Sequence, residues 1–524
     1  MNIKVIREGR EVVFEGKEDI SLLEQLREND IYISAACGGK GKCGKCKVQM
    51  TAGATEITDA DRQFFTEEEL KSGWRLACLV FPKTDCTLVV FSDDESEFEV
   101  VAQHEENEKA DIRKEDGYDI GIDIGTTTIA IELVGRTSGQ VLHTVTTINR
   151  QRAFGADVIS RIQASNDGQK EALKESIRKD LYEGMKRLVE ESGAQAERIG
   201  KVVIAGNTTM GHLLMGYSCE TLGVYPFTPV NIGTITSSFH EMFEEQQQAD
   251  DSQALKLEAE IILLPGISTY VGADISSGML VCDFDKLEKP CLLIDLGTNG
   301  EMAIGNKDKM LVTSTAAGPA FEGGNISCGM GSVPGAICKV NITDGEVSVE
   351  TIGEKAPIGL CGTGVIETVC ELVKEELVDE TGMLEEDYFD DGFELAKTPD
   401  GDPIVFTQKD VREIQLAKSA VRAGVETLMK RYGVTYDEVD KVFLAGGFGY
   451  KIDLEKTIGI GMLPEEFREK TTAIGNSSLA GTIQYLTDPD AKERLEKIVA
   501  LSEEVELSSD KDFNNFYTEY MFFE

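Results

Sequence analysis

Cys37-Gly38-Gly39-Lys40-Gly41-Lys42-Cys43-Gly44-Lys45-Cys46 places three cysteines within ten residues. A fourth cysteine, Cys78, follows 32 positions after the last of them. Thiolates are soft ligands that select zinc or the iron of iron-sulfur clusters. The four glycines of the stretch can adopt positive φ, so the backbone can curl around a metal group and turn amide donors toward its sulfur atoms. The stretch therefore predicts a metal centre with four thiolate ligands.

The cysteine spacing distinguishes an iron-sulfur cluster from a zinc site. A C-x4-C-x2-C…C run marks plant-type 2Fe-2S ferredoxins. Here the first gap is one residue longer, a form that resembles adrenodoxin-like ferredoxins. Cys43-x-x-Cys46 could be half of a zinc knuckle, but such a site normally has a second pair, and neither Cys37 nor Cys78 has a CxxC neighbour. We predict a 2Fe-2S cluster held by these four cysteines, with zinc and purely structural thiols as the alternatives.

The sequence around this loop predicts that residues 1–92 form one domain. Alternating apolar residues on both sides of Gly9 predict a β-hairpin. Ser21 followed by Glu24 is the signature of a capped helix, and the cysteine loop comes next, before a polar helix near residues 67–71 and two further strands. Hairpin, helix, cysteine loop and closing strands resemble the β-grasp ferredoxin fold.

The composition limits the setting in which the chain works. A net charge of -42 argues against nucleic acid and anionic membranes as partners, because binding to them depends on Lys and Arg. The apolar runs fall far short of the roughly 18 residues of a membrane span, and residues 1–5 do not resemble a signal peptide. We therefore expect a cytoplasmic protein with free thiols. The cysteines expected to be small buried apolar residues are Cys86, Cys219, Cys282, Cys291, Cys328, Cys338, Cys361 and Cys370.

Residues 93–117 are expected to be an acidic linker. They are rich in Asp, Glu, Lys and Asn and contain few large apolar residues, so their charge would hold the flanking domains apart. A mobile linker would let the cluster travel relative to the rest of the chain. An inert, solvated surface helix is the alternative interpretation.

The rest of the chain, residues 118–524, contains an internal repeat. A buried strand, Asp123, a glycine turn and a second strand open the first part, and the same order returns around Asp295. In each part a long amphipathic helix then precedes an apolar strand that ends at Gly206 or Gly446. The two α/β halves predicted in this way are residues 118–289 and 290–524.

Each Asp-to-Gly turn has the features of a phosphate site. Gly125 and Gly297 are expected to adopt positive φ and to leave out the Cβ that would block a phosphate. Backbone amides and threonine hydroxyls of the turns would donate hydrogen bonds to phosphate oxygens. Asp123 and Asp295 end their strands and suit Mg²⁺, which keeps most of its waters and takes one or two carboxylates. Two such turns in matching halves predict a nucleotide between them.

This arrangement resembles the ASKHA superfamily, which includes acetate and sugar kinases, Hsp70 and actin. The resemblance implies that residues 123–128 are the phosphate-1 motif, residues 295–300 the phosphate-2 motif and residues 444–449 the adenosine motif. The corresponding segment of the first half, residues 205–209, is expected to make domain contacts instead of binding ATP. The nucleotide-binding residues implied are Gly125, Thr126, Thr127, Thr128, Gly297, Thr298, Asn299, Gly300, Gly446, Gly447 and Gly449.

Three further glycine-rich segments are expected to border the nucleotide. Residues 317–324 form the first, residues 359–364 open a helix whose N-terminal amides could face a phosphate, and residues 475–478 open another helix. Ordinary helix capping is the alternative for each. Glu301 and Glu322 are the candidates for orienting a hydrolytic water, and they join Asp123 and Asp295 as predicted catalytic residues. The loop residues selected as cofactor-binding are Gly318, Gly323, Gly324, Gly362 and Thr363.

A 2Fe-2S β-grasp domain joined to an ASKHA ATPase resembles one family, the reductive activators of corrinoid proteins. The likeness runs across almost the whole chain to the aromatic tail at residues 516–523, although a larger insertion found in some relatives is absent. The resemblance implies one-electron reduction of Co(II) to Co(I) in a corrinoid methyl-transfer protein, driven by ATP and Mg²⁺ and supplied by a low-potential electron donor. It also implies a homodimer. Clusters of this type lie near -400 mV, so the transfer needs free energy from ATP.

Two other functions stay open from the sequence. An activator of 2-hydroxyacyl-CoA dehydratases is also an ASKHA ATPase, but it would need a 4Fe-4S cluster shared between subunits. A non-catalytic redox sensor would bind ATP only to change partners and would reduce no corrinoid. A flavin- or NAD-dependent ferredoxin reductase is disfavoured because no convincing G-x-G-x-x-G follows a predicted strand.

Overall fold

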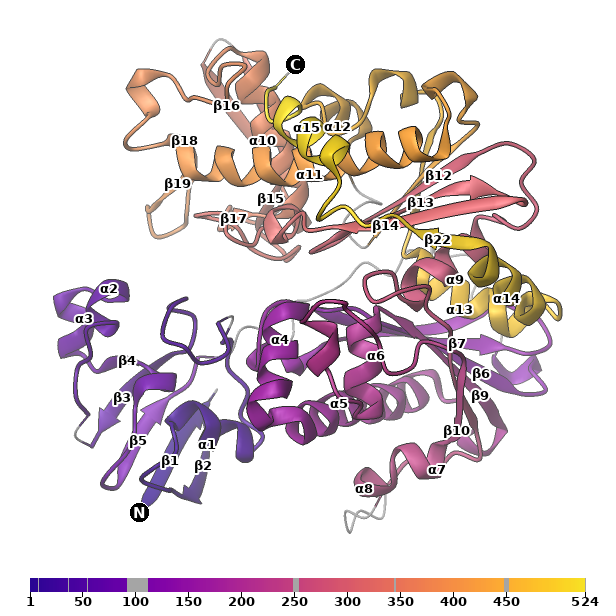
Figure 1. Cartoon of the computed structure of the whole chain (residues 1–524). Helices are drawn as coiled ribbons and strands as arrows, with labels where there is room; N and C mark the ends of the chain where they lie inside the picture. Colours follow the sequence, from indigo (N-terminus) through magenta and orange to yellow (C-terminus); the bar gives the residue numbers. More distant parts are fainter. Residues whose placement is uncertain are drawn as a thin grey trace.

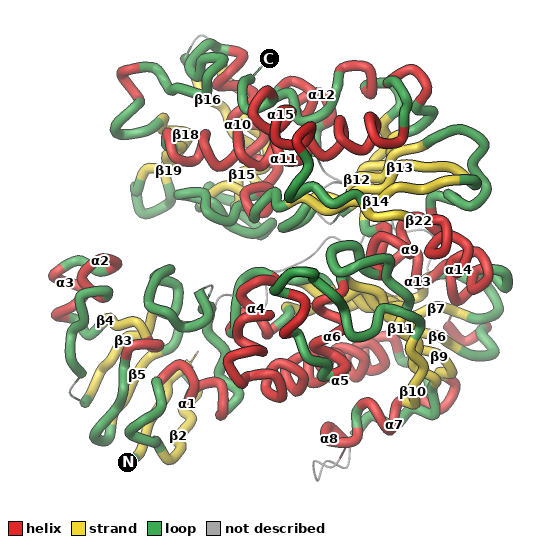
Figure 2. Tube along the Cα trace, in the orientation of Figure 1, coloured by secondary structure: helices red, strands yellow, loops and turns green. Residues whose placement is uncertain are grey.

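The computed structural model describes residues 1–7, 9–35, 37–53, 55–91, 112–247, 254–343, 345–446 and 452–523. Most of the predicted linker lies outside the described residues, as do Gly447 and Gly449 of the predicted adenosine motif. Figure 1 shows two lobes, one above the other, with the N-terminal domain beside the lower lobe. Figure 2 shows that each lobe combines a sheet with covering helices.

The N-terminal domain is a five-stranded sheet with the order β2-β1-β5-β3-β4. β1 and β2 form the predicted hairpin, and β1 also pairs in parallel with β5. Ser21 caps α1 by accepting a hydrogen bond from the Glu24 amide, as predicted. This topology confirms the β-grasp fold. The bounds are β1 (Asn2–Arg7), β2 (Arg10–Glu15), α1 (Leu22–Glu28), β3 (Lys47–Ala52), α2 (Asp61–Phe64), α3 (Glu67–Lys71), β4 (Trp74–Leu76) and β5 (Cys86–Val89).

The lower lobe is built on a six-stranded sheet with the order β10-β11-β9-β6-β7-β8. β6 runs antiparallel to β7 and parallel to β9, which places Asp123 opposite Ala205. The bounds are β6 (Tyr118–Ile124), β7 (Thr128–Gly135), β8 (Val141–Ile148), α4 (Val158–Ala164), α5 (Lys170–Ser192), β9 (Ile199–Gly206), α6 (Thr208–Met215), β10 (Ile235–Ser238), α7 (Phe239–Met242), α8 (Glu244–Gln247) and β11 (Glu260–Leu263).

The upper lobe repeats this plan with the order β21-β20-β12-β13-β14-β22. β12 is antiparallel to β13 and parallel to β20, which places Asp295 opposite Ala445. The two aspartates therefore occupy equivalent positions, and the predicted duplication of the fold is confirmed. The bounds are β12 (Cys291–Leu296), β13 (Gly300–Asn306), β14 (Lys309–Thr315), α11 (Gln408–Tyr432), β20 (Val442–Ala445), β21 (Thr471–Gly475) and β22 (Ser502–Glu504).

Additional elements enlarge the upper lobe. A three-stranded sheet and a hairpin lie between β14 and α11 in the chain. The C-terminal helix α15 packs on α11, where Ser419 donates a hydrogen bond of 2.8 Å to the carbonyl of Tyr520. The bounds are β15 (Ala336–Thr343), β16 (Glu346–Thr351), β17 (Gly359–Leu360), α10 (Gly362–Lys374), β18 (Phe393–Lys397), β19 (Pro403–Phe406), α12 (Leu454–Gly459) and α15 (Lys511–Glu519).

Three helices join the lobes: α9 (Ala273–Val281), α13 (Ser477–Thr487) and α14 (Ala491–Leu501). α13 packs against α9 and also against β6 and β9, so a helix from late in the chain covers the sheet of the first half. Gly481 allows this close approach, because a Cβ there would lie 2.4 Å from the carbonyl oxygen of Ser277. A shared apolar core runs from Val203 in the lower sheet to Leu293 in the upper one.

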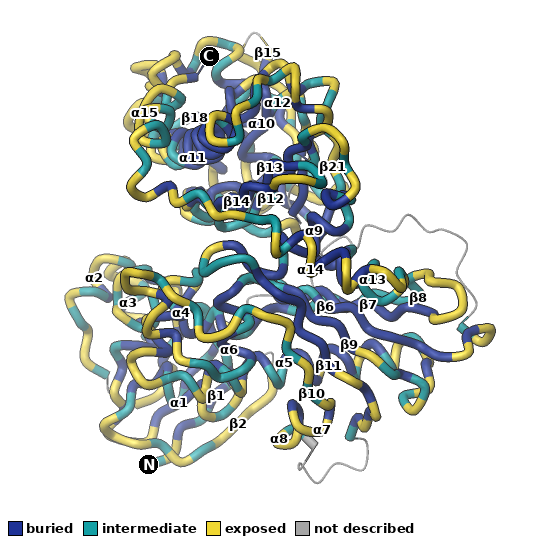
Figure 3. Tube along the Cα trace, turned by 45° about the vertical axis from the view of Figure 1, so that its right-hand side comes forward, coloured by how far each residue is buried: buried dark blue, intermediate teal, exposed yellow. Residues whose placement is uncertain are grey.

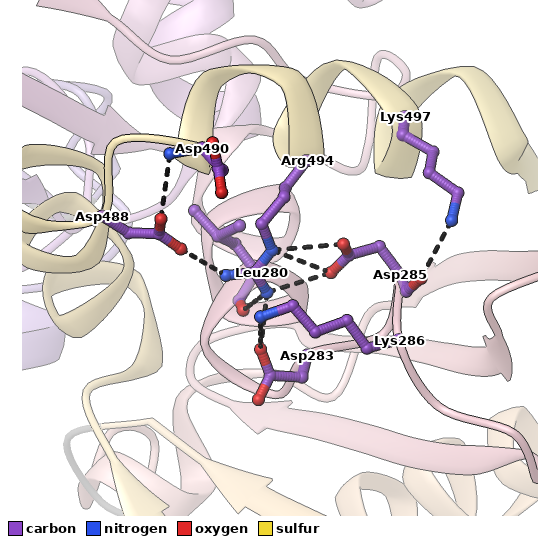
Figure 4. Close-up of polar contacts among 8 residues, drawn as sticks. All are labelled: Leu280, Asp283, Asp285, Lys286, Asp488, Asp490, Arg494 and Lys497. Atoms are coloured by element: carbon purple, nitrogen blue, oxygen red, sulfur yellow. Dashed lines mark hydrogen bonds and ion pairs between the residues drawn. The ribbon is translucent and has the colours of Figure 1, made fainter.

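Arg494 on α14 stabilises this junction through ion pairs. Its guanidinium contacts Asp283 at 2.6 Å, Asp285 at 3.0 Å and Asp488 at 2.7 Å. Figure 4 shows these carboxylates gathered around the arginine from two parts of the chain. Arg494 and Asp285 are buried, so each depends on the other to offset its loss of hydration.

Burial follows this architecture. Figure 3 shows buried residues along the central strands of both lobes and exposed residues along the outer loops. Over the described residues, none of the helices combines the length and apolarity that a membrane crossing requires.

Candidate functional site

The four cysteines of the predicted cluster form two pairs. The sulfur atoms of Cys46 and Cys78 lie 3.4 Å apart, and both residues are buried. Cys37 and Cys43 are half-buried, and their thiols are hydrogen-bonded to each other. All four thiols are free. Two pairs suit a cluster in which each of two irons takes two thiolates, whereas one zinc ion would need four ligands around a single point.

Backbone donors surround these thiols. The amides of Lys40, Lys42 and Cys43 point toward Cys37 and lower its pKa, although its burial opposes this effect. The amide of Gly41 points toward Cys78 in the same way. Gly38, Gly39, Gly41 and Gly44 all have positive φ, as predicted. Amide donors around sulfur atoms are the surroundings that iron-sulfur clusters use to stabilise their charge.

The hydrogen bond that Cys46 shares with Cys78 lowers the pKa of the Cys46 thiol to about 7 and raises that of Cys78. Burial lowers the pKa of Arg27 on α1 to about 10, and the charges of Glu24, Cys46 and Cys78 partly oppose this effect. Among the described residues, no group hydrogen-bonds to its buried Nε. A buried cation with an unpaired donor fits an anionic group at the cysteines. The residues present therefore suit a 2Fe-2S cluster.

No three His, Cys, Asp or Glu side chains converge on one point suited to a single metal ion within the described part of the chain. This agrees with two thiol pairs at the cysteine site. It also means that the carboxylates described below do not form a ready-made cage for a bare cation. An ion held through water molecules and phosphate oxygens, as Mg²⁺ commonly is, needs no such cage.

The predicted phosphate-1 turn is held from three sides. The Gly125 amide donates to the Thr128 carbonyl at 3.0 Å, which closes the turn. Asn149 donates to the Gly125 carbonyl at 2.9 Å, and Asn207 donates to the Thr126 hydroxyl at 3.2 Å. Asn207 thus serves the turn of its own half, whereas Ala205, which was also expected to make domain contacts, belongs to the core shared by both lobes.

The expected positive φ at Gly125 and Gly297 is wrong, because neither glycine lies in that region. A Cβ on Gly125 would still lie 2.6 Å from the Thr128 carbonyl oxygen, so the tightness of the turn excludes a side chain. At Gly297 the nearest atom would be 3.7 Å away, which is ordinary contact. Gly125 is therefore required because a side chain would clash with the first turn. No atom of the described residues excludes a side chain at Gly297 in the same way.

Four carboxylates gather between the two sheets. Asp123 is the last residue but one of β6, Asp295 and Glu301 are paired across β12 and β13, and Asp274 lies in the first turn of α9. Burial raises the pKa of Asp274 to about 7 and of Asp295 to about 8, and repulsion among the carboxylates adds to the effect. The pKa of Asp123 and that of Glu301 are raised as well, chiefly by burial.

Asp274 was not among the sequence-predicted residues. It follows Gly272 at the start of an apolar helix and carries no motif of its own. Only the packing of α9 between the lobes brings it to Asp123 and Asp295, whose charges interact with it. The motifs used to select the other residues, paired glycines and an Asp before a glycine turn, do not occur at Asp274.

Asp123 is also held by the upper half of the chain. Asn476 donates to it at 2.8 Å and Ser478 at 2.7 Å. Asn476 caps α13 at the same time by accepting from the Leu479 amide. The segment 475–478 therefore both caps a helix and contacts the predicted site.

The predicted phosphate-2 turn packs against two predicted residues. The Thr298 hydroxyl donates to Glu322 at 3.2 Å, and burial raises the pKa of Glu322. Asn299 hydrogen-bonds to Glu301, and Gly300 begins β13. Gly446 has φ +103°, and a Cβ there would lie 2.2 Å from the Leu296 carbonyl oxygen and 2.9 Å from an oxygen of Asp295. This part of the predicted adenosine motif thus presses directly on the turn.

The remaining glycine loops lie beside Glu322. It ends the short 3-10 helix Pro319–Glu322, which Gly318 precedes and Gly323 and Gly324 follow. Gly362 and Thr363 open α10, which packs against that 3-10 helix. In the described residues, the N-cap Cys361 makes no side-chain hydrogen bond to the amides of α10.

The comparisons with known proteins cover the same regions. Residues 5–83 match the family "2Fe-2S iron-sulfur cluster binding domain", residues 118–287 match "RACo middle region", and residues 289–524 match "C-terminal domain of RACo the ASKHA domain". The chain is 33% identical over 421 residues to "Corrinoid activation enzyme RamQ" of Eubacterium limosum, a match that covers 76% of this chain and 69% of the relative.

Two further comparisons agree. The chain is 27% identical over 441 residues to the "[Co(II) methylated amine-specific corrinoid protein] reductase" of Methanosarcina barkeri, covering 76% of both chains. Among solved structures, "Reductive activator for corrinoid,iron-sulfur protein" matches with a TM-score of 0.70 and 27% identity, covering 99% of this chain and 98% of that one.

Proposed function

The chain belongs to the family of reductive activators of corrinoid proteins, and on this premise we propose that it reduces Co(II) to Co(I) in a corrinoid methyl-transfer protein in a step coupled to ATP hydrolysis. One relative named above is called a corrinoid activation enzyme, and the other is called a reductase of a Co(II) corrinoid protein. The observation that carries the proposal is the presence, in one chain, of two thiol pairs and a duplicated Asp turn.

Cys37 and Cys43 would hold one iron, and Cys46 and Cys78 the other. The pairing of their thiols supports this assignment. When bound, the 2Fe-2S cluster supplies a single electron at low potential. The loop amides and Arg27 would stabilise its negative charge, and the half-buried Cys37 and Cys43 would form the side nearest to solvent.

The two Asp turns would hold MgATP. The Gly125 and Gly297 amides close the turns by bonding to Thr128 and Asn299, so the other amides of residues 125–128 and 297–300, with the Thr126 and Thr127 hydroxyls, would bind phosphate oxygens. Asp123 and Asp295 would hold Mg²⁺ through water. Burial, and after it the charges of neighbouring carboxylates, raises the pKa of Asp274, Asp295 and Glu301, so a divalent cation would offset this repulsion and that of the phosphates. Glu301 and Glu322, both with a raised pKa, would orient the attacking water.

ATP can drive an unfavourable electron transfer only if it binds one conformation of the protein better than another. The contacts of Asn476 and Ser478 with Asp123 join the two halves of the chain at the predicted phosphate site. Nucleotide binding there would change the angle between the lobes and, with it, the binding of the corrinoid protein. A low-potential donor would return the electron to the cluster, and two copies of the chain would form a homodimer.

The dehydratase-activator alternative is not favoured. It requires a cluster shared between subunits, whereas four cysteines of one chain pair within one β-grasp domain here. The redox-sensor alternative is not favoured either, since the relatives are named as an activation enzyme and a reductase.

The proposal can be tested by mixing the reduced chain anaerobically with a purified Co(II) corrinoid protein and following the Co(I) absorbance. We expect Co(I) with MgATP and little with MgADP or without nucleotide. An Asp295→Asn variant should lose the ATP effect while keeping its cluster. Equal Co(I) yields in all three nucleotide conditions would contradict the proposal.

A further inference from the structure

Arg27 connects the cysteine site with the lower lobe. It lies near the end of α1 and is only 9% exposed. Its Nη2 donates to the carbonyl oxygen of Ala153, and its guanidinium carbon lies 4.6 Å from the ring centroid of Phe154. The charges of Cys46 and Cys78 act on it, and α1 packs against the short 3-10 helix Ala77–Leu79, which carries Cys78. One side chain therefore contacts the lower lobe and interacts electrostatically with two of the predicted cluster ligands.

The charge of Arg27 survives its burial. Loss of hydration lowers its pKa to about 10, so the guanidinium stays protonated at neutral pH. Within the described residues its Nε has no hydrogen-bond partner. A buried cation that lacks a full set of partners stabilises any negative charge added beside it, and the low dielectric of the interior strengthens that effect.

The segment that Arg27 contacts also holds the phosphate-1 turn. Ala153 ends the 3-10 helix Arg150–Ala153, and Asn149 caps this helix. The Asn149 side chain donates to the Gly125 carbonyl and its amide to the Thr127 carbonyl, both at 2.9 Å. Only one short helical turn thus separates the predicted phosphate site from the contact with Arg27.

Apart from Tyr32, which packs against the apolar core of the lower lobe, the rest of this domain contact includes polar pairs and an open space. Asp30 pairs with Lys179 at 2.7 Å, and Gln169 donates to Glu24 at 3.2 Å. A cavity of about 780 Å³ lies between α1 and α5. Contacts of this kind between domains resemble transient protein interfaces, so a small displacement of the Asn149 segment can change how the two domains meet.

We propose that Arg27 is a positioning residue that sets the reduction potential of the cluster and links it to the nucleotide turn. Reduction adds one electron, and hence one negative charge, to the cluster, and the buried guanidinium stabilises that charge. Movement of the Asn149 segment on nucleotide binding would shift Arg27 and change how readily the cluster gives up the electron. The inference rests on the proposed cluster and nucleotide sites and deepens them.

The test is a redox titration of the reconstituted chain, monitored by the EPR signal of the reduced cluster, with no corrinoid protein present. It compares the wild type with R27Q, R27K and the control K179Q, each without nucleotide and with a non-hydrolysable ATP analogue. K179Q removes the exposed ion pair of the same interface, which is far weaker than a buried contact.

We expect R27Q to lower the equilibrium constant for cluster reduction at least tenfold, a shift of about -59 mV. The wild type should show a nucleotide-dependent difference in potential that R27Q loses, although its affinity for the analogue changes less than threefold. R27K keeps the positive charge but lacks the forked guanidinium. Without nucleotide, its equilibrium constant for cluster reduction should stay within threefold of the wild-type value. The difference in potential that the ATP analogue causes should fall by half or more. K179Q should match the wild type in both.

An iron-loaded R27Q with the wild-type potential and nucleotide difference would overturn the inference. If R27Q does not retain iron, R27K decides: an unchanged nucleotide difference in R27K would also overturn it. A wild-type chain that binds no cluster would instead refute the proposed function, so the two failures are distinguishable.

Discussion

Replacing Gly446 by alanine should damage the upper half of the nucleotide site, and the same change at Gly433 should not. Both glycines have positive φ, +103° at Gly446 and +91° at Gly433. A Cβ at Gly433 would meet no atom within 4 Å, whereas at Gly446 it would lie 2.2 Å from the Leu296 carbonyl oxygen. The pair therefore separates backbone strain from the clash with the phosphate-2 turn.

The magnitudes follow from these contacts. Positive φ alone should cost alanine about 1–2 kcal/mol at Gly433. At Gly446 the overpacking should add about 1–3 kcal/mol. Real Cβ contacts essentially never fall below 3.0 Å, so the Leu296 carbonyl oxygen, 2.2 Å away, must move by about 0.8 Å and displace the adjoining Asp295 with it. A displacement of about 1 Å at a reacting centre can cost roughly a hundredfold in rate, so G446A should lose at least tenfold in ATP hydrolysis.

The assay compares wild type, G433A and G446A by thermal unfolding, by titration with a fluorescent ATP analogue and by phosphate release. G433A should keep its nucleotide affinity and rate within about twofold, because its new methyl group contacts nothing. G446A should melt at a lower temperature than G433A and should lose rate and affinity. Indistinguishable behaviour of the two variants would refute the placement of Gly446 against the phosphate-2 turn.

Three further predictions follow from other parts of the structure. Cys46→Ala should abolish the cluster absorbance and remove at least half of the bound iron. Cys86→Ala, in the same domain but outside the two thiol pairs, should keep the absorbance and the iron. Equal iron content in the two variants would contradict the ligand assignment. Arg494→Ala should lower the free energy of unfolding by about 3–5 kcal/mol, because it leaves the buried carboxylate of Asp285 without its ion-pair partner. Lys286→Ala, which breaks an exposed pair, should cost under about 1 kcal/mol in urea unfolding. Burial, which outweighs a neighbouring arginine, raises the pKa of Asp180 to about 7; the folded state therefore binds the extra proton, and this carboxylate makes the wild type less stable as pH rises from about 4 to 7. Asp180→Asn should flatten that decline in melting temperature, and parallel pH profiles would count against it.

Much of the architecture was predictable because local signals and the fold agree. Ser21 and Glu24 specify the start of α1, and the glycines of the cysteine loop have the positive φ that a tight metal loop requires. The repeat around Asp123 and Asp295 predicted two equivalent sheets because a buried strand followed by an Asp turn recurs in the same order. These features depend on residues that are close in sequence.

The rest depends on long-range packing. Asp274 joins the carboxylates only because α9 lies between the lobes, and α13 covers a sheet that precedes it by some 350 residues, as the bond from Asn476 to Asp123 shows. The sequence likewise gave no signal for the contact of Arg27 with Ala153, since both ends are ordinary positions in their own segments. Positive φ at Gly125 was a wrong inference from glycine content; the carbonyl of Thr128 supplies the actual steric reason.

The most direct test of the central claim is a single-turnover experiment with electron counting. The chain is reduced, freed of external reductant and mixed anaerobically with a Co(II) corrinoid protein and MgATP, while Co(I) absorbance and the EPR signal of the reduced cluster are recorded together. One Co(I) should appear for each cluster signal lost, and neither change should occur with MgADP. Co(I) formation without loss of the cluster signal, or at the same rate with MgADP, would contradict the account.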